Sequence, residues 1–515
     1  MANSVRGRRA FLQTSSLAVG SMLLPSFVKA QGSSSAKLSL GAVTGVSVPE
    51  RFIGLSYENM QLEDPTFFSA NNKGLVEQFR AISPRGVLRL GGNTSEFNWW
   101  KARPTDAPPV RNIVLKDGSK PADYLYAITP ETIRELDSFL RATGWTCIYG
   151  LNLGYGTPET DVPEAQFVFE TLGPRLEYFQ IGNEVDNFPQ YHLREKATWN
   201  VDVYLQEWLT IARAVQKAIR GAKFGLPDVA GDARWLTRIA EQWHAVDNQP
   251  NVITLSHHHY WSGPPSNPNA TIERLMQPDV AAEKQASLAK AAAKLMNTAY
   301  RMTEGNTVYR GGKYGLSDVF AAALWGADYL LQLMSHGYSG VNLHGGSGHA
   351  QAVSVGGTFV GEADMKDPNV PHPKPFYTPI ANEGTLAGSG VGGKLNSNYL
   401  LEPVGYGMKF AAAFAGTTLL SVEFNPAGVN AEAYAARTSK DKTLIAILNK
   451  DFNQDLYVDL PPFTVEQVLT APSMDAREAH LLTAQEAASA IRTRGASLTV
   501  PKHTGVLLAV KVMPG

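Results

Sequence analysis

Short apolar runs alternate with longer amphipathic stretches from about residue 50 to about residue 345. The apolar runs have the length of buried strands, and the amphipathic stretches have the length of helices. The predicted strands are Phe52–Ser56, Val87–Leu90, Cys147–Leu151, Tyr178–Ile181, Phe224–Leu226, Val252–Ser256, Tyr300–Thr303 and Gly340–Leu343. Helix-like stretches include Asp202–Ile219, Ala233–Val246, Ala281–Met296 and Ser317–Ser335. Eight strands with helices between them predict an α/β fold, a (β/α)8 TIM barrel over residues 50–393.

After residue 393 the pattern changes to short runs of alternating apolar and polar residues separated by turns. Examples are Leu419–Phe424, Thr443–Leu448, Leu456–Leu460 and Val506–Val510. This period predicts strands, so we expect residues 394–515 to form a C-terminal antiparallel β-sandwich domain. Residues 31–49 contain a further strand-like segment, which we expect to join that domain. Two stretches, 101–128 and 345–393, are predicted to be long loops at the functional end of the barrel.

The first 30 residues have the layout of an export signal. Arg8 and Arg9 precede an apolar stretch from Leu17 to Leu24, and a small residue, Ala30, ends the segment. Paired arginines in this position indicate the Tat route. The apolar stretch is shorter than the ~20 residues that a membrane span needs. We therefore expect a signal peptide at residues 1–30, a periplasmic or secreted protein, and no membrane span in the mature chain.

Composition and net charge indicate a globular protein that does not bind nucleic acid. Hydrophobic residues make up 44% of the 515 residues and charged residues 18%, which is typical of a globular protein with a sizeable core. Removal of residues 1–30 would take away four basic residues and no acidic one, and the net charge would change from −1 to −5. Such a chain lacks the basic surface that nucleic acid requires. The single cysteine, Cys147, excludes an internal disulfide.

Polar and titratable residues follow the predicted strands at the end where a TIM barrel carries its active site. They are Glu58 after the first strand, Asn93 after the second, Asn152 after the third, Asn183 and Glu184 after the fourth, His257–Tyr260 after the sixth, Glu304 after the seventh and His344 after the eighth. Glycoside hydrolysis needs two carboxyl groups on either side of one sugar carbon. Glu184 and Glu304 are the candidate pair, and the crowded rim favours an enzyme over a binding scaffold.

Four motifs in these positions resemble glycoside hydrolase family 79, the family of heparanases and β-glucuronidases. They are FIGLSYE at Phe52–Glu58, VLRLGGN at Val87–Asn93, QIGNEVD at Gln180–Asp186 and EGNTVYRGG at Glu304–Gly312. The resemblance runs through most of the mature sequence. In overall layout the chain looks most similar to the bacterial exo-acting β-glucuronidases of that family.

The resemblance implies a role for each matching residue. Glu184 matches the acid/base and Glu304 the nucleophile of a retaining exo-acting β-D-glucuronidase, which would release terminal glucuronic acid by double displacement and would need no cofactor. The matching substrate-binding positions are Glu58, Asn93, Asn183, Tyr260, Tyr309, the backbone N–H of Gly311, and Tyr377. Tyr309 and Gly311 match the groups that hold the substrate carboxylate. Arg310 departs from the heparanases, which carry glycine at this position.

Three consecutive histidines, His257, His258 and His259, raise the question of a metal site. Neighbours on a strand face opposite sides, so only His257 and His259 could share a face. No cysteine and no helical histidine pair supports them. We expect one of these two to hydrogen-bond substrate or nucleophile, the other to pack in the core, and no metal to bind.

Other functions remain open at this point. An endo-acting, heparanase-like hydrolase of uronate-containing polysaccharides would use the same two acids in a cleft open at both ends. A non-catalytic carbohydrate-binding protein would need neither acid. A cofactor-bearing oxidoreductase would fit Tat export, but Gly388–Gly393, which matches G-x-G-x-x-G by letter, lacks the flanking strand and helix of a dinucleotide site.

Overall fold

The computed structural model describes residues 35–111, 113–347, 376–383, 395–438, 442–487, 491–494 and 497–511. The predicted signal peptide lies outside the described residues, as does most of the predicted loop 345–393. Ser35–Gly515 form one compact unit. No helix in the described part of the chain is long and apolar enough to cross a membrane.

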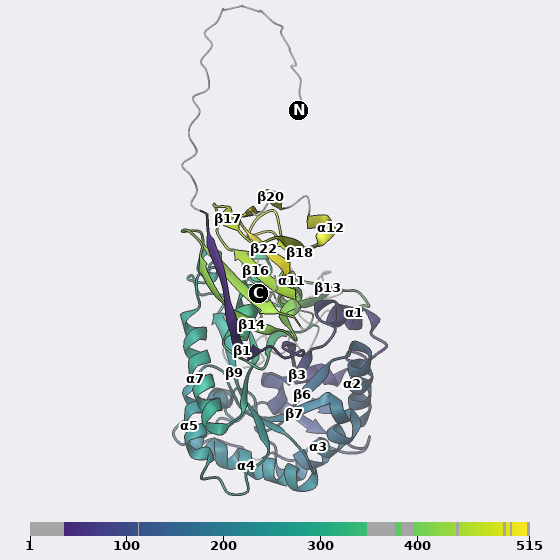
Figure 1. The fold of residues 1–515 in the computed structure, drawn as a ribbon. Coiled ribbons are helices and arrows are strands. Elements are labelled where there is room, and N and C mark those ends of the chain that lie inside the picture. The colour runs from purple at the N-terminus through teal and green to yellow at the C-terminus, as the bar shows by residue number, and fades with distance from the viewer. Residues whose placement is uncertain are drawn as a thin grey trace, which may run out of the picture. The chain divides into compact units, whose positions relative to one another are not determined.

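Eight parallel strands close into a barrel, which confirms the predicted TIM fold (Figure 1). In barrel order they are β2 (Ile53–Glu58), β3 (Val87–Gly91), β6 (Thr146–Leu151), β7 (Leu176–Ile181), β8 (Phe224–Val229), β9 (Val252–Ser262), β10 (Ala299–Val308) and β11 (Val341–Gly345). β11 pairs with β2 and closes the cylinder. Each of the eight predicted strands corresponds to one of these, including the short fifth strand that contains Gly225.

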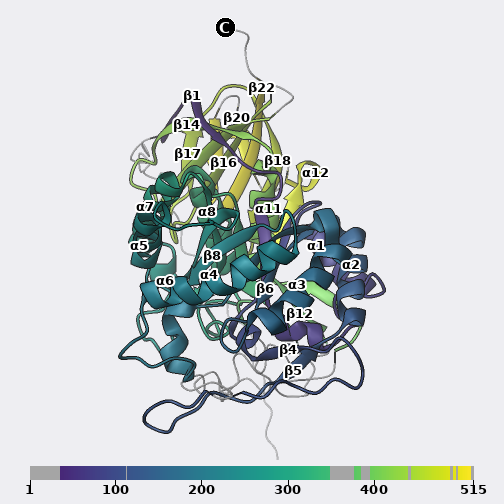
Figure 2. The same cartoon turned by 90° about the horizontal axis from the view of Figure 1, so that it is seen from below.

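Helices surround the barrel (Figure 2). They are α1 (Lys73–Ile82), α2 (Pro130–Thr143), α3 (Pro158–Leu172), α4 (Val201–Ala218), α5 (Arg234–Trp243), α6 (Ile272–Leu275), α7 (Val280–Met296) and α8 (Phe320–Ser335). Local sequence sets their ends. The Asn200 side chain accepts hydrogen bonds from the backbone N–H groups of Asp202 and Val203 and so caps α4. Gly144 ends α2 in the left-handed conformation that glycine adopts without strain.

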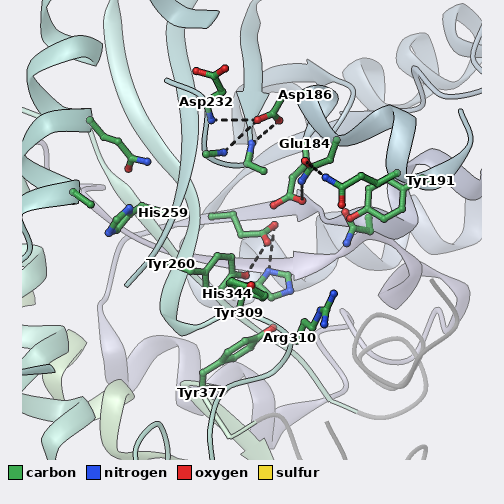
Figure 3. Close-up of a pocket in the computed structure, with 18 of the residues that line it drawn as sticks. Glu184, Asp186, Tyr191, Asp232, His259, Tyr260, Tyr309, Arg310, His344 and Tyr377 are labelled. Atoms are coloured by element: carbon green, nitrogen blue, oxygen red, sulfur yellow. Dashed lines mark hydrogen bonds and ion pairs between the residues drawn. The ribbon is translucent and has the colours of Figure 1, made fainter. Parts of the chain in front are cut away.

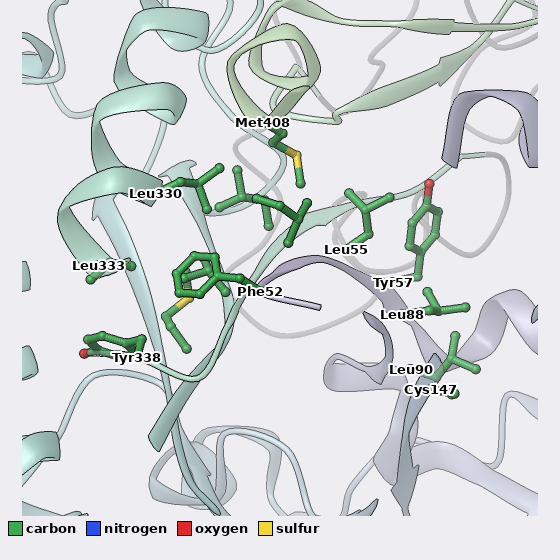
Figure 4. Close-up of a cluster of buried hydrophobic side chains, with 14 of the residues drawn as sticks. Phe52, Leu55, Tyr57, Leu88, Leu90, Cys147, Leu330, Leu333, Tyr338 and Met408 are labelled. Carbon is green, nitrogen blue, oxygen red and sulfur yellow. The ribbon is translucent and has the colours of Figure 1, made fainter. Parts of the chain in front are cut away.

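The strands are buried on both faces, because side chains fill the barrel interior and helices cover its exterior. Figure 4 shows the apolar cluster on the outer side, where Phe52 and Leu55 lie near Leu330 of α8. Cys147 is a free, buried thiol in the same cluster. This continuous packing fixes the strands and therefore the positions of the side chains at their ends.

The C-terminal part forms a seven-stranded antiparallel sheet and a three-stranded one. The larger sheet has the order β1 (Lys37–Ser47), β14 (Thr418–Asn425), β15 (Ala431–Arg437), β16 (Lys442–Asn449), β22 (Thr504–Lys511), β18 (Phe463–Thr470) and β19 (His480–Thr483). The smaller contains β17 (Leu456–Asp459), β21 (Ser497–Val500) and β20 (Arg492–Arg494). Both sheets contribute to one apolar cluster, in which Ile447 and Val458 are buried. β1, purple in Figure 1, pairs with β14 from the far end of the sequence.

Three contacts join helix α8 of the barrel to the C-terminal part of the chain. Gly407 of α11 (Pro403–Ala411) lies so close to α8 that an added Cβ would come within 2.2 Å of the Ala323 carbonyl oxygen. Asp328 of α8 accepts hydrogen bonds from Tyr434 Oη at 2.6 Å and from Lys450 Nζ at 2.5 Å. The Lys450 side chain is only 4% exposed, so its charge depends on Asp328.

We expect Lys450→Ala to lower the free energy of unfolding by about 3 kcal/mol, because it leaves the Asp328 carboxylate without its buried partner. Lys442→Ala is a matched control, since Lys442 pairs with Glu466 at 2.9 Å with 42% of its side chain exposed. That variant is expected to lose less than about 1 kcal/mol. Denaturant titration at neutral pH measures both. Equal losses would show that Lys450 contributes no more than a surface ion pair.

Candidate active site

A polar pocket of about 660 Å³ opens at the carboxyl ends of the barrel strands (Figure 3). Seven of the nine predicted site residues line it: Glu58, Asn93, Glu184, Tyr260, Glu304, Tyr309 and Tyr377. Asn183 and Gly311 do not line the pocket and lie directly beside Glu184 and Arg310 in the chain. The structure therefore brings together residues that are up to 319 positions apart in the sequence, between Glu58 and Tyr377.

Glu184 follows β7 and begins the 3₁₀ helix η4 (Val185–Tyr191). Its backbone has φ 46°, an uncommon conformation for a residue with a Cβ, and its N–H donates to the Asp228 carbonyl at 2.8 Å. The carboxylate meets His258 Nδ1 at 3.1 Å through Oε1 and accepts from Asn187 Nδ2 at 3.2 Å through Oε2. Strained backbone of this kind is typical of functional positions.

Glu304 lies within β10, and its side chain is 8% exposed. Oε2 accepts a hydrogen bond from Arg89 Nη1 at 2.6 Å, and Oε1 accepts one from Tyr260 Oη at 2.8 Å. Burial raises the pKa of this carboxyl, but His344, His258 and Arg89 outweigh burial and lower the pKa to about 2. Glu304 is therefore held ionised, as a nucleophile must be.

Arg89 occupies the centre of the barrel with no exposed surface. Its guanidinium donates to Ser56 Oγ at 3.1 Å and to Gln180 Oε1 at 3.2 Å, in addition to Glu304. Arg89 Nη2 also donates to Asn183 Oδ1, at 2.6 Å, and to Asp228 Oδ2. Burial lowers the Arg89 pKa, but Asp228 and Glu304 outweigh burial and raise the pKa above its ordinary value. Our sequence reasoning missed this residue, although a charged residue inside an apolar strand is a signal in itself.

Asp228 and His258 are two more residues that we did not predict. Asp228 ends β8 and binds Arg89, and its side chain is 2% exposed. Burial raises the Asp228 pKa, but Arg89 and His258 lower it well below its usual range. His258 lies between two carboxylates, with Nδ1 at 3.1 Å from Glu184 and Nε2 at 3.2 Å from Asp228.

The other two histidines have separate partners. His257 is buried and its Nε2 lies 2.8 Å from Tyr338 Oη, which is the core packing expected for one of the pair. His259 lines the pocket, and its Nε2 lies 2.7 Å from Asp279 Oδ2. Strand alternation predicts a functional contact for His257 or His259. The histidine that contacts the predicted acid Glu184 is instead His258.

Glu58 and Asn93 line one wall of the pocket, and Asn183 is hydrogen-bonded to Asn93. Glu58 Oε2 accepts from the backbone N–H of Thr94 at 3.0 Å and from its hydroxyl at 2.6 Å. Gly92 has φ 73°, and a Cβ there would lie 2.3 Å from the Glu58 carboxylate, so this position requires glycine. Asn183 Oδ1 accepts from Gly92 N–H at 3.1 Å, and its Nδ2 donates to Asn93 Oδ1 at 3.2 Å.

Another wall of the pocket follows the end of β10. Arg310, Gly311 and Gly312 have φ values of 60°, 82° and 89°, so the chain turns sharply after Tyr309. The Tyr377 N–H donates to the Gly311 carbonyl at 3.2 Å, which fixes Tyr377 against this turn. In Figure 3, Tyr309, Arg310 and Tyr377 lie on the side of the pocket opposite Asp186 and Asp232, with Glu184 between the two groups.

One trio of metal-ligand type occurs among the described residues. Ligand atoms of Glu184, His258 and Glu304 all lie within 4.8 Å of one another. Both nitrogens of His258 already face carboxylates, and Arg89 donates to Glu304, so the histidine offers no free lone pair. Each member of the trio therefore has hydrogen-bond or ion-pair partners within the protein.

No family model matches the chain. Two curated fungal proteins named Beta-glucuronidase match part of it. The protein from Aspergillus niger is 27% identical over 312 residues, which cover 56% of each chain. The protein from Neurospora crassa is 25% identical over 324 residues, covering 56% of this chain and 54% of that protein. The chain thus spans about half the length of the curated relatives it matches, and these matches confirm the resemblance to β-glucuronidases.

Solved structures share the fold across nearly the whole chain. The 4-O-α-L-rhamnosyl-β-D-glucuronidase from Fusarium oxysporum has a TM-score of 0.66 and 16% identity, covering 92% of this chain and all of that one. The α-L-arabinofuranosidase from Thermotoga maritima has a TM-score of 0.60 and 16% identity, with 93% and 100% covered. At this level of identity the structures establish the architecture only.

Glu304 generates a prediction for stability against pH. Its pKa is about 2 in the folded protein and 4.5 ordinarily, so its contribution is present above pH 4.5 and is lost as the pH falls toward 2. Between pH 5 and pH 2 we expect the wild type to lose roughly 2 to 3 kcal/mol more unfolding free energy than Glu304→Gln. Denaturant unfolding at several pH values measures the difference. Parallel curves for the two proteins would contradict an ionised, paired Glu304.

Proposed function

We propose that the protein is a retaining, exo-acting β-D-glucuronidase that releases terminal glucuronic acid by double displacement. The observation that carries this proposal is the pair of acids facing one pocket, with a carboxylate oxygen of Glu184 within 4.8 Å of one of Glu304. Both come from the ends of different barrel strands, where such enzymes carry their chemistry.

The reaction begins with attack of ionised Glu304 on the anomeric carbon while Glu184 transfers its proton to the departing oxygen. A glycosyl ester on Glu304 results, and the aglycone leaves as an alcohol. Ionised Glu184 then takes a proton from water, which attacks the same carbon and restores Glu304 as a carboxylate. Tyr260 and Arg89 orient the Glu304 carboxylate through its two oxygens throughout.

The separation of the acids supports retention of configuration. Carboxyl groups ~5–5.5 Å apart are typical of double displacement, whereas inverting enzymes separate them by ~6.5–9.5 Å to admit a water molecule. The 4.8 Å limit on the approach of the two side chains agrees with the shorter spacing. Direct attack by Glu304 is therefore favoured over attack by water.

Recognition of a uronate is assigned to the turn after β10. Tyr309 and Arg310 line the pocket, and Tyr309 lies against Tyr260 with ring centroids 6.3 Å apart. A phenolic O–H, a backbone N–H at Gly311 and a guanidinium are suitable partners for a carboxylate. The names of the fungal relatives point to the same substrate class.

Exo action is supported by the loop at residues 101–128. β4 (Asn98–Trp100) and β5 (Tyr126–Ile128) pair at its base, and the Lys116 N–H donates to Glu195 beyond η4. This loop is thus attached to the segment that follows η4. We further propose that the protein reaches the periplasm or the exterior by the Tat route, on the basis of residues 1–30.

The decisive assay compares an aryl β-D-glucuronide with the matching aryl β-D-glucoside. We expect the glucuronide to be cleaved, with the β-anomer of glucuronic acid as first product by NMR, and the glucoside to react at least about 100-fold more slowly. Cleavage of a heparan-type polymer without cleavage of the glucuronide would establish the endo-acting alternative.

Substitution of the two acids tests the catalytic assignment. Glu304→Gln is expected to reduce turnover by at least about 10⁴-fold, and Glu184→Gln by about 10²–10⁴-fold with poor leaving groups. Glu241→Gln is the matched control, because Glu241 is exposed on α5 and away from the pocket. A carbohydrate-binding protein would retain its function in both active-site variants.

Tyr309→Phe tests carboxylate recognition. Loss of the hydroxyl is expected to lower kcat/KM for the glucuronide roughly tenfold, since a hydrogen bond to a charged group contributes about 1.5 kcal/mol or more. The small rate with the glucoside should not change. Tyr314→Phe is the control, because Tyr314 is 40% exposed and does not line the pocket. An equal loss for both substrates would place Tyr309 outside carboxylate binding.

A further inference from the structure

Two cations lie among the buried acids of the site, each against a different catalytic candidate. Arg89 donates to Glu304 at 2.6 Å, and His258 Nδ1 lies 3.1 Å from Glu184. Asp228 joins them, because it binds Arg89 through Oδ2 and lies 3.2 Å from His258 Nε2 through Oδ1. A chain of contacts therefore runs from Glu304 through Arg89, Asp228 and His258 to Glu184.

The two carboxylate contacts favour a doubly protonated His258, whose Nε2 also lies 3.5 Å from Arg89 Nη2. A neutral imidazole has one N–H donor and one acceptor nitrogen, whereas both nitrogens of His258 face carboxylate oxygens. Only the imidazolium form donates in both directions. Burial lowers the His258 pKa, but Asp228 and Glu304 outweigh it and raise the pKa to about 10. The charge thus persists through neutral pH.

We propose that His258, held by Asp228, is a positioning residue that stabilises the ionised form of Glu184 in the glycosyl-enzyme intermediate. This inference rests on the proposed double displacement. In the first step, one negative charge moves from Glu304 to Glu184, and the cations Arg89 and His258 lie beside these two acids.

The charges of the chain of contacts balance on both sides of that step. Before it, Arg89 and His258 face ionised Glu304 and Asp228, while Glu184 holds its proton. When Glu304 forms the ester, its charge is lost, and Glu184 becomes ionised as its proton goes to the leaving oxygen. Two positive and two negative groups remain. A buried site with unchanged net charge avoids the cost of an unpaired ion in either state.

Other titratable groups also surround these residues. Tyr260 and His344 face Glu304, and His344 Nε2 also lies 3.7 Å from Glu58. Asp186 faces Glu184 and is held by backbone N–H groups of Ala230, Gly231 and Asp232. His257 and His259, on either side of His258, have Tyr338 and Asp279 as partners. The neighbours of His258 Nε2 are Asp228 and Arg89.

The test uses His258→Gln, which removes the cation, and 2,4-dinitrophenyl β-D-glucuronide, whose leaving group departs without a proton from Glu184. The burst of dinitrophenolate should remain within about threefold of the wild-type rate, because this step needs only Glu304. Steady-state kcat should fall about tenfold at neutral pH, since breakdown of the ester needs ionised Glu184. The acidic limb of the kcat profile should move up by about one pH unit.

Azide supplies a readout that general damage to the fold would not give. It attacks the anomeric carbon without base assistance, so it should restore turnover of His258→Gln and produce a glycosyl azide. His257→Gln is the matched control on the same strand, with unmoved pH limbs and no gain from azide. An unmoved acidic limb in folded His258→Gln would overturn the inference.

A measurement on the wild type covers the case in which His258→Gln does not fold. In protein labelled with ¹⁵N-histidine, one imidazole should show two protonated nitrogens at pH 8.5. Absence of any imidazolium signal at that pH would overturn the inference. Wild-type protein that forms no burst with the dinitrophenyl substrate would instead refute the proposed glucuronidase function, so the two failures are distinct.

Discussion

The buried guanidinium of Arg89 is the interaction on which the arrangement of the site depends. An arginine with no exposed surface is tolerated only where hydrogen-bond acceptors and negative charge surround it. Here those groups come from separate strands: Ser56 of β2, Gln180 of β7, Asp228 of β8 and Glu304 of β10. The same contacts that satisfy the cation fix the orientation of Glu304 and hold it ionised. Stability of the barrel centre and ionisation of the proposed nucleophile therefore depend on the same contacts.

The barrel and the two acids were predictable because both leave a local signal. Fully buried strands produce apolar runs such as Cys147–Leu151, and the residues just after them must lie at the carboxyl rim. Glu184 follows the fourth strand, whereas Glu304 lies inside the seventh, because β10 extends to Val308. Barrel closure brings both to one pocket. The strand at residues 37–47 was also predicted, and β1 pairs with β14 at the edge of the larger sheet.

The contacts among the buried residues Arg89, Asp228 and His258 could not be predicted in the same way. Arg89, Asp228 and His258 meet only because β3, β8 and β9 are brought around the barrel, and a single strand does not record which neighbour its inward side chain will face. Register shifts near Pro227 and Val229 on β8 and between Met302 and Glu304 on β10 alter the pairing next to His258. Alternation correctly separated His258 from His257 and His259. Alternation alone does not predict that His258 lies between the carboxylates of Glu184 and Asp228.

Charge balance at the centre also separates reaction from specificity. In the proposed mechanism, Arg89 and His258 neutralise Glu304 and Asp228, so the anomeric carbon lies in an environment without large net charge. In the same proposal, the carboxylate of a uronate needs only local partners, which the turn at Tyr309–Gly311 would provide. Changes in that turn can alter the sugar that is bound without disturbing the proton transfers below it.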